Sequence, residues 1–426
     1  MLNATSVIQT AKHLVGDAFA AEMEEMVDCA QKALTRLHSA ATFGSIRWIK
    51  TTQQQVFRSF AVRLCCVVLS VEKTDEAITS GFLRQVAGEL DAFADPDEPV
   101  RAYAKVKSNR GDWRPICAFG PRRKALQTLV NLVLIAKFGP HPLDFMAHGR
   151  GSEIAADRIT QLIDGGIDHF VVADIEACFR SVKQGKVAEL LGLPPAVVRH
   201  CLLIGEDVPL ILPSALPLDT SPQAFSEAVR QGLPQGARSS NRVVSQLLGP
   251  ELGSLTSDSR IILYGDDIAV PAATRLEADT FAKTLPERLG AHPAGPFRLK
   301  RCEVAEAQVG FNFLKYKVRR DRFTGAAQLR PSDLSYHRFH ERVREIVRLE
   351  ALDEVYPAVM AYRDHWLTSF RRYEANPTAL NLLGLLSIGH LPGHLLKKWD
   401  FSCQTYAKSG QPVLHHVDDW LDLGVA

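Results

Sequence analysis

The chain has 426 residues, of which 46% are hydrophobic and 23% charged, proportions typical of folded globular proteins that exclude wholesale disorder and fibrous structures. Lys and Arg total 50 against 48 Asp and Glu, which leaves a net charge of +2, so polyanion binding must depend on local basic clusters. No apolar run is long enough for a membrane span and the first residues lack a secretory pattern, so we expect a cytoplasmic protein without a membrane partner.

The predicted elements begin with helices. Residues 1 to about 95 carry apolar residues at helical spacing and end at a Pro-containing break. A short apolar run at 169–173 leads into Asp174, which is typical of a buried strand that presents an acid at its end. We interpret the Pro-rich residues 205–230 as a connecting excursion. The other predicted elements are a hairpin at 100–116, helices at 122–138 and from about 151, a helix ending at 252, and helices at 333–349, 352–373, 377–387 and 417–423.

The eight cysteines are scattered without a Cys-x-x-Cys pair or a His partner at zinc spacing. We therefore expect reduced, buried thiols, and neither a zinc site nor a disulfide framework. The length favours two or three subdomains around a shared core.

Two adjacent acids, Asp266 and Asp267, follow Tyr264 and Gly265 between two runs of β-forming apolar residues. This pattern predicts a tight hairpin whose turn carries both carboxylates. Paired carboxylates in such a turn can present oxygen ligands to divalent metal ions. The alternative is an ordinary surface hairpin with solvated acids.

Asp174 is the natural third carboxylate. Nucleotidyl transfer uses two divalent ions about 4 Å apart, and Mg²⁺ prefers hard oxygen ligands while it keeps phosphates and waters. A βαββ palm would place the end of the Asp174 strand beside the Asp266-Asp267 turn. The alternative is that Asp174 caps the helix that follows the strand.

At this point the sequence resembles the reverse transcriptases over roughly residues 100–316. The resemblance predicts an α+β right-hand polymerase with fingers, a βαββ palm and a helical thumb. It rests on three ordered motifs, at 171–179, 232–236 and 264–267, with fingers-like segments at 105–116, at Gln127 and at 148–152, and with downstream segments at 297–300 and 311–314. The domain boundaries that follow are 1–99 (helical N-terminal extension), 100–168 (fingers), 169–318 (palm) and 319–426 (thumb and tail).

The resemblance also implies a role for each motif residue. Gly236 is expected to let the backbone approach the template-base pair, and Lys300 to protonate the pyrophosphate leaving group. The expected metal ligands, for two Mg²⁺ ions or Mn²⁺ as a substitute, are Asp174, Ile175, Asp266 and Asp267; the expected nucleotide-binding residues are Lys105, Lys107, Arg114, Phe179, Gln235 and Gly236; the expected primer grip is Phe313 and Leu314. For Lys105, Lys107 and Arg114 the alternative is a solvated hairpin face.

Phe179 lies five residues after Asp174, where reverse transcriptases carry a bulky aromatic that excludes the ribose 2′-hydroxyl. RNA-dependent RNA polymerases typically have an acid there. The resemblance therefore implies DNA synthesis from dNTPs, and the alternative for Phe179 is a plain core aromatic.

Basic residues outside the motifs are candidates for nucleic-acid binding. Arg150 follows the fingers segment, and Arg338 and Arg342 share a predicted thumb helix, where contacts to phosphates would add salt-dependent affinity. Glu341 and Glu345 lie among them, so an ordinary salt-bridged helix face is the alternative. Trp366 is expected to be a core residue.

The chain departs from the family pattern at two turns. After Gly236 most of the family continues to a Ser-Pro pair, whereas here Ala237 and Arg238 follow, so we expect different template-side contacts. In the primer grip, Lys315 replaces the common Gly after Leu314, so we expect an altered primer turn.

The overall pattern resembles the unknown-group or defence-associated bacterial reverse transcriptases, with retron and group II intron-type enzymes as relatives. This implies a dedicated non-coding RNA as template, a DNA product and a role in anti-phage defence, with an oligomer or a partner protein left open. The alternatives are a template-independent or RNA-synthesising polymerase of the same fold, and a catalytically silent RNA-binding scaffold.

Overall fold

The structure is a computed structural model that describes residues 2–72, 78–106, 113–146, 151–255, 260–370 and 392–409. The chain forms two compact units, each of which is described by itself. The first consists of Met1–Gly149, Ala173–Ile268 and Thr280–Cys302, and the second of Arg150–Val172, Ala269–Asp279 and Glu303–Ala426. The four domain ranges expected from the sequence stay a prediction.

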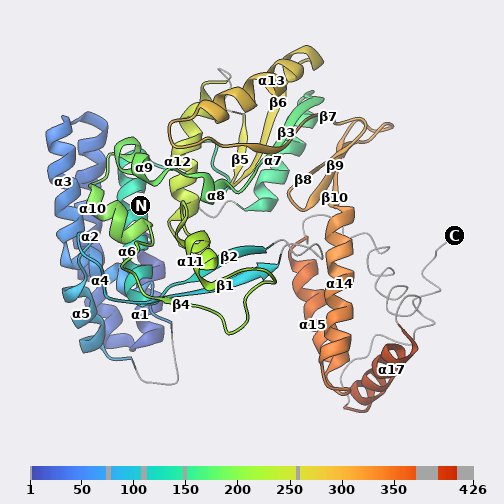
Figure 1. Cartoon of the computed structure of the whole chain (residues 1–426), viewed down its shortest axis with the longest axis horizontal. Coiled ribbons are helices and arrows are strands. Elements are labelled where there is room, and N and C mark those ends of the chain that lie inside the picture. The colour runs from blue at the N-terminus through green and yellow to red at the C-terminus, as the bar shows by residue number, and fades with distance from the viewer. Residues whose placement is uncertain are drawn as a thin grey trace. The chain divides into compact units, whose positions relative to one another are not determined.

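An N-terminal helical layer, defined here as residues 4–89, begins the first unit (Figure 1). The helices of the layer are α1 (Ala4–Leu14), α2 (Asp17–Phe43), α3 (Ile46–Arg58), α4 (Phe60–Val68) and α5 (Ser80–Glu89), and α6 (Pro121–Phe138) packs against α2, α3 and α4. Helices α1, α3, α4 and α5 start where a Ser, Thr or Asn side chain accepts a hydrogen bond from a backbone N–H three residues on, as Ser59 does from Val62. The long helix α2 buries an apolar stripe at three- and four-residue spacing and packs against α1, α3, α4 and α6. The helices predicted before residue 95 and at 122–138 are confirmed.

A small sheet follows the helical layer in sequence. Strands β1 (Val100–Val106) and β2 (Trp113–Ala118) form the predicted antiparallel hairpin, and β4 (Leu210–Ile211) pairs parallel with β1. Helix α11 (Pro222–Arg230) packs against β2, with Trp113 stacked on Phe225 at 5.1 Å between ring centroids. The prediction of a mere excursion at 205–230 is therefore wrong for its second half. Ser221 followed by Pro222 was the available helix-start pattern.

The central sheet has the strand order β5-β6-β3-β7. Strand β3 (His169–Ile175) buries its residues 170–173 completely, which is why an uninterrupted apolar run occurs there. The hairpin strands are β5 (Ile262–Tyr264) and β6 (Asp267–Ala272), and β7 is Leu299–Glu306. The helices between and beside these strands in sequence are α8 (Cys178–Ser181), α9 (Gln184–Leu191), α10 (Pro195–Val197), the π-helix η1 (Val198–Leu202), α12 (Ser240–Gly253) and α13 (Arg275–Ala291).

The second unit contains a three-stranded sheet and a helical bundle. Helix α7 (Ser152–Asp164) packs against β9 and β10, and the strand order is β10-β9-β8. The strands are β8 (Phe311–Phe313), β9 (Tyr316–Arg320) and β10 (Ala327–Pro331), and the bundle helices are α14 (Asp333–Leu349), α15 (Val355–Thr368) and α17 (Gly393–Lys408).

The bundle packs around Phe339, Val347, Tyr356 and Trp399. Trp366 packs against Phe339 and other rings of this unit, so its predicted core position is confirmed. The helix predicted at 333–349 is confirmed. The helices predicted at 377–387 and 417–423 lie outside the described residues. Within the described ranges, no helix has both the length and the apolar character that a membrane crossing requires.

Candidate active site

The three predicted acidic residues lie at neighbouring strand ends of the central sheet, within the first unit. Asp174 is the penultimate residue of β3, and Asp267 begins β6 directly after the turn formed by Gly265 and Asp266. Gly265 has φ +65°, which a glycine adopts without strain. The Ile175 N–H donates to the Asp266 carbonyl at 3.0 Å and joins the strand end to the turn. The structure therefore brings together the acids that the sequence assigned to one site.

The carboxylates are close enough to affect one another. Burial, followed by repulsion from Asp266 and Asp174, raises the pKa of the Asp267 carboxyl to about 7, while Arg301 opposes the shift. A half-buried acid beside two others is costly to ionise unless positive charge is present. The site therefore favours a cation.

The residues present fit a divalent cation by their donor chemistry, because all three supply hard carboxylate oxygens. Within the described ranges, no group of three or more His, Cys, Asp or Glu side chains is already arranged to hold a metal ion. The assignment of Asp174, Ile175, Asp266 and Asp267 as ligands thus rests on the shared strand ends and on the mutual repulsion of the acids.

Phe179 is joined to the second motif through its main chain. The Leu233 N–H donates to the Phe179 carbonyl at 2.8 Å. A Cβ on Gly232, which has φ +66°, would lie 2.2 Å from that carbonyl oxygen. Ala177 takes the left-handed conformation, φ 47°, where the chain leaves β3 for the short helix α8. The Phe179 side chain is half-buried, and its role as a sugar gate stays a prediction.

Gly236 has a reason to be glycine that the sequence did not suggest. Its φ is +102°, and a Cβ there would lie 2.2 Å from the carbonyl oxygen of Cys117 on β2. The Cys117 N–H also donates to the Gln235 carbonyl at 2.7 Å. The close approach required of Gly236 is thus to the protein backbone, in addition to any approach to a template base.

Lys105 and Arg114 are directly opposite each other on the β1–β2 hairpin. Like charges at such positions are destabilising unless an anion neutralises them. Lys105 is exposed and Arg114 half-buried, and the buried Nε of Arg114 has no hydrogen-bond partner among the described residues. This pair is suited to bind a phosphate group. Lys107 and Arg150 lie outside the described residues.

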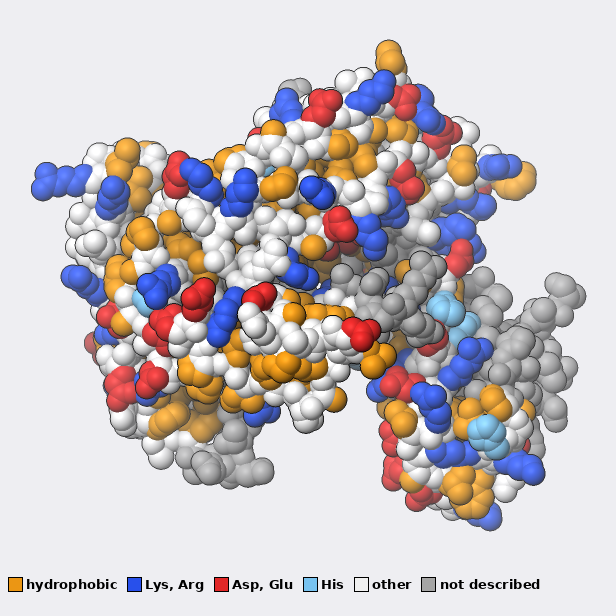
Figure 2. Space-filling model, viewed as in Figure 1, with side chains coloured by type: hydrophobic (Ala, Val, Ile, Leu, Met, Phe, Trp, Pro, Cys, Tyr) orange, Lys and Arg blue, Asp and Glu red, His pale blue; other side chains and the backbone are white. Residues whose placement is uncertain are grey.

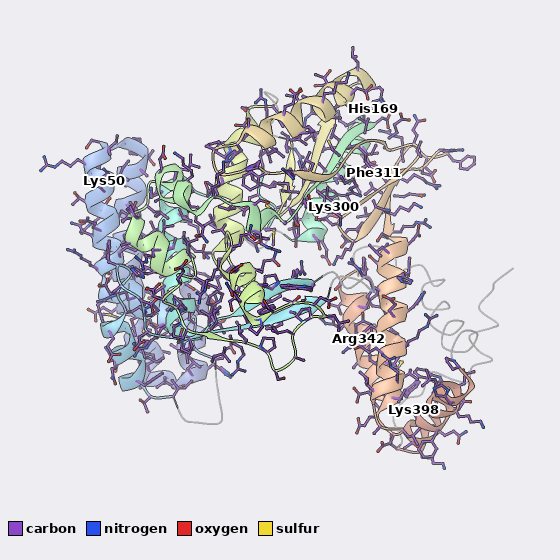
Figure 3. The ribbon with its side chains drawn as sticks, viewed as in Figure 1. Lys50, His169, Lys300, Phe311, Arg342 and Lys398 are labelled. Atoms are coloured by element: carbon purple, nitrogen blue, oxygen red, sulfur yellow. The ribbon has the colours of Figure 1, made fainter. Side chains whose placement is uncertain are left out.

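Lys300 is an exposed residue of β7, the strand next to β3 (Figure 3). The Glu176 N–H donates to the Arg298 carbonyl at 2.8 Å, which joins the segment after Asp174 to the segment before β7. Lys300 therefore lies on an element that adjoins the acidic strand end.

The predicted primer grip is a tight turn in the second unit. Phe313 is fully buried at the end of β8, and Leu314 is held in the left-handed conformation, φ 55°. Lys315 is oriented inward: its Nζ donates to the Ser369 carbonyl at 2.9 Å and lies 4.8 Å from the centre of the Phe370 ring. The departure at Lys315 thus ties this turn to the end of α15.

The bundle helix α14 carries Arg338 and Arg342 on exposed positions, and Arg342 is labelled in Figure 3. Arg342 pairs with Glu345 at 2.5 Å, which supports the salt-bridged interpretation for that residue. Lys, Arg and His side chains are frequent on the bundle surface (Figure 2). Their part in nucleic-acid binding stays a prediction.

Sequence reasoning missed two residues that organise the site. Arg238 was noted only as a departure, and Cys117 only as a buried thiol. The charge of Arg238 directly after a glycine turn was the available pattern, whereas nothing local indicates the role of the Cys117 backbone.

Acids at adjoining strand ends, a basic hairpin and a glycine loop bound to it are typical of the palm and fingers of a nucleic-acid polymerase. The chain belongs to the reverse transcriptase (RNA-dependent DNA polymerase) family, whose sequence profile matches residues 105–317. The protein is therefore an RNA-directed DNA polymerase of α+β right-hand fold, as predicted. In general terms it takes an RNA template, nucleotides and divalent metal ions.

Among solved structures, a telomerase from Candida albicans in complex with the TWJ fragment of telomeric RNA is similar to this chain. The match has a TM-score of 0.37 and 12% identity, and it covers 77% of this chain and 67% of that one. A search of curated proteins finds no match.

Proposed function

We propose that the protein makes DNA from dNTPs on a dedicated non-coding RNA, with Asp174, Asp266 and Asp267 as the ligands of two Mg²⁺ ions. The observation that carries the site assignment is the meeting of the β3 end with the Gly265-Asp266 turn, where burial and the charges of Asp266 and Asp174 raise the pKa of Asp267. Bound Mg²⁺ would supply charge neutralisation for the triphosphate and activation of the primer 3′-hydroxyl. Ile175 adds its backbone to the same strand end.

The other residues take positioning roles. Lys105 and Arg114 hold the triphosphate from the fingers hairpin, where their mutual repulsion is relieved by the anion. Gln235 and Gly236 line the nucleotide site on a loop hydrogen-bonded to β2. Lys300 donates a proton to the leaving pyrophosphate. Phe313 and Leu314 support the primer end.

Phe179 acts as the sugar gate. Its main chain is held by Leu233 and packed against Gly232, so the backbone that carries the ring is fixed to the second motif. An apolar ring at this position offers no hydrogen bond to a ribose 2′-hydroxyl and obstructs it sterically. Phe179→Ala is therefore expected to raise the use of rNTPs relative to dNTPs, by about 10-fold or more for a contact worth about 1.4 kcal/mol.

The first experiment measures DNA synthesis by the purified protein with its co-purifying RNA, with dNTPs and Mg²⁺ or Mn²⁺. Asp266→Asn and Asp267→Asn should abolish synthesis, while Asp17→Asn should leave it intact because Asp17 is an exposed residue of α2 paired with Lys12. Synthesis that survives both palm substitutions would contradict the metal assignment.

The dedicated template and the defence role are supported by the resemblance to defence-associated enzymes and by no separate structural feature. Sequencing the RNA and DNA that co-purify with the protein reports template, start site and product together. One abundant RNA species with a matching cDNA is expected. Heterogeneous cellular RNA would contradict the dedicated template. Phage protection by Asp267→Asn equal to that by the wild type would contradict the defence role of the DNA product.

A further inference from the structure

Arg238 extends from the second motif toward the N-terminal helical layer. Its Nη1 donates to the Leu69 carbonyl at 2.9 Å and lies 3.3 Å from the Ser70 hydroxyl and 3.4 Å from the Thr128 hydroxyl. Leu69 is the C-terminal cap residue of α4. A guanidinium at a helix C-terminus satisfies a free carbonyl and interacts favourably with the helix dipole.

The backbone of Arg238 is held as firmly as its side chain. Its N–H donates to the side-chain oxygen of Gln127 at 3.0 Å, and its carbonyl accepts from the side-chain amide of Asn131 at 3.0 Å. Both partners lie on α6, and Gln127 is buried. The end of α4 and the side of α6 therefore hold three groups of Arg238: its backbone N–H, its backbone carbonyl and its guanidinium.

The loop held in this way is the predicted nucleotide platform. Gln235 and Gly236 precede Arg238 by three and two positions, and β2 holds the other side of the loop through Cys117. We propose that Arg238 is a positioning residue for this loop, so that the N-terminal helical layer forms part of the nucleotide-binding apparatus. The inference rests on the proposed nucleotide-binding role of Gln235 and Gly236.

The alternative use of Arg238, as a phosphate-binding residue, fits the contacts less well. Although the residue as a whole is exposed, the Nη1 of its guanidinium is placed against a carbonyl and two hydroxyls of the protein, which directs the side chain to the end of α4 and to α6. Partial burial lowers the pKa of Arg238, and Glu72, which pairs with Lys124 at 2.5 Å, is a nearby negative charge.

Four variants of the full chain test the proposal: Arg238→Met, Arg238→Lys, the double variant Ser70→Ala with Thr128→Val, and Arg47→Met as the control. Arg47 is an exposed residue of α3, so its loss removes the same charge from the helical layer without touching the loop. The measurements are the KM for dNTP, kcat, the melting temperature, and hydrogen exchange of the amides of residues 235–238 and of Cys117.

Arg238→Met is expected to raise the KM for dNTP and lower kcat/KM by about 10- to 100-fold, because a loop displaced by about 1 Å loses productive geometry. The amides of 235–238 should exchange faster, the double variant should change in the same direction by a smaller factor, and Arg238→Lys should recover part of the loss. Arg47→Met should match the wild type.

Three outcomes overturn the inference: unchanged KM and exchange in Arg238→Met, a loss of kcat that only follows the fraction of folded protein, or unchanged kinetics and exchange in the double variant. If Arg238→Met fails to fold, the hydroxyl double variant decides alone. If the wild type incorporates no nucleotide, the proposed function is contradicted. Faster exchange of the loop amides in Arg238→Met would then still show the anchoring, so the two failures are distinguishable.

Discussion

Replacing Gly236 by Ala separates a structural requirement from a template-binding one. An alanine at φ +102° is strained by about 1–2 kcal/mol, and its Cβ would lie 2.2 Å from the Cys117 carbonyl oxygen, a backbone atom that cannot rotate away. Relieving this overlap requires β2 and the loop to separate, which threatens the 2.7 Å bond from Cys117 N–H to the Gln235 carbonyl, worth about 1 kcal/mol. The free energy of unfolding should therefore fall by about 2–3 kcal/mol.

The assay is thermal unfolding of the protein without nucleic acid. At about 2 °C per kcal/mol for a large chain, Gly236→Ala should lower the Tm by about 5 °C. Gly185→Ala is the matched control, because Gly185 lies in α9 with open space around it and an alanine there should be neutral or stabilising by about 0.5–1 kcal/mol. If Gly236→Ala keeps the wild-type Tm and loses only polymerase activity, then the glycine serves the nucleic acid and the backbone argument is refuted.

Three further predictions follow from charges. In metal-free protein the pKa of Asp267 is raised from 3.8 to about 7, so the folded state is favoured while this carboxyl is protonated and loses that stability as the pH rises through about 7. Mg²⁺ should therefore raise the Tm more at pH 8 than at pH 6. An equal effect at both pH values would contradict this. Lys315→Met should shorten the DNA products and cost about 1 kcal/mol of stability, since the Ser369 carbonyl loses the Lys315 donor but keeps that of the Tyr316 hydroxyl; unchanged product lengths would count against it. Arg123→Met should cost about 1.5–3 kcal/mol in denaturant titrations, because the buried Arg123 binds the partly exposed Asp95 at 2.9 Å; a cost below about 1 kcal/mol would disprove that role.

The parts of the site that the sequence predicted are those with local causes. An apolar run ending at Asp174 and a Gly-containing turn between β-forming residues each determine their own conformation. The order of three motifs then identifies the family. The helix at 333–349 was predictable for the same reason, since its apolar spacing and its Ser332 cap lie within the segment itself.

The parts that escaped prediction depend on residues far apart in sequence. Arg238 and the Leu69 carbonyl are separated by 169 residues, and no periodic pattern relates a loop arginine to the end of one helix among several. The contact of Gly236 with Cys117 is of the same kind. Helix α11 was missed because the Pro-rich stretch before it obscured the cap at Ser221.

Both departures from the family pattern serve the same physical purpose. Arg238 donates to Leu69, the residue that caps the C-terminus of α4, and Lys315 donates to Ser369, which caps the C-terminus of α15. Helix C-termini have unsatisfied carbonyls and partial negative charge, so a cation placed there gains a hydrogen bond and a favourable dipole interaction together.

Lys137 makes a third such contact, with the carbonyls of Leu191 and Gly192 at the end of α9. At Arg238 and Lys315, where most of the family has a small residue or Pro, the turn is anchored here to a helix end. Because the anchor is a cation, neutral substitutions remove both interactions at once, whereas exchange of Lys for Arg preserves the charge and at least one donor. The unusual residues beside the second motif and the primer grip are thus best understood as anchors for these turns, with their contacts directed into the protein.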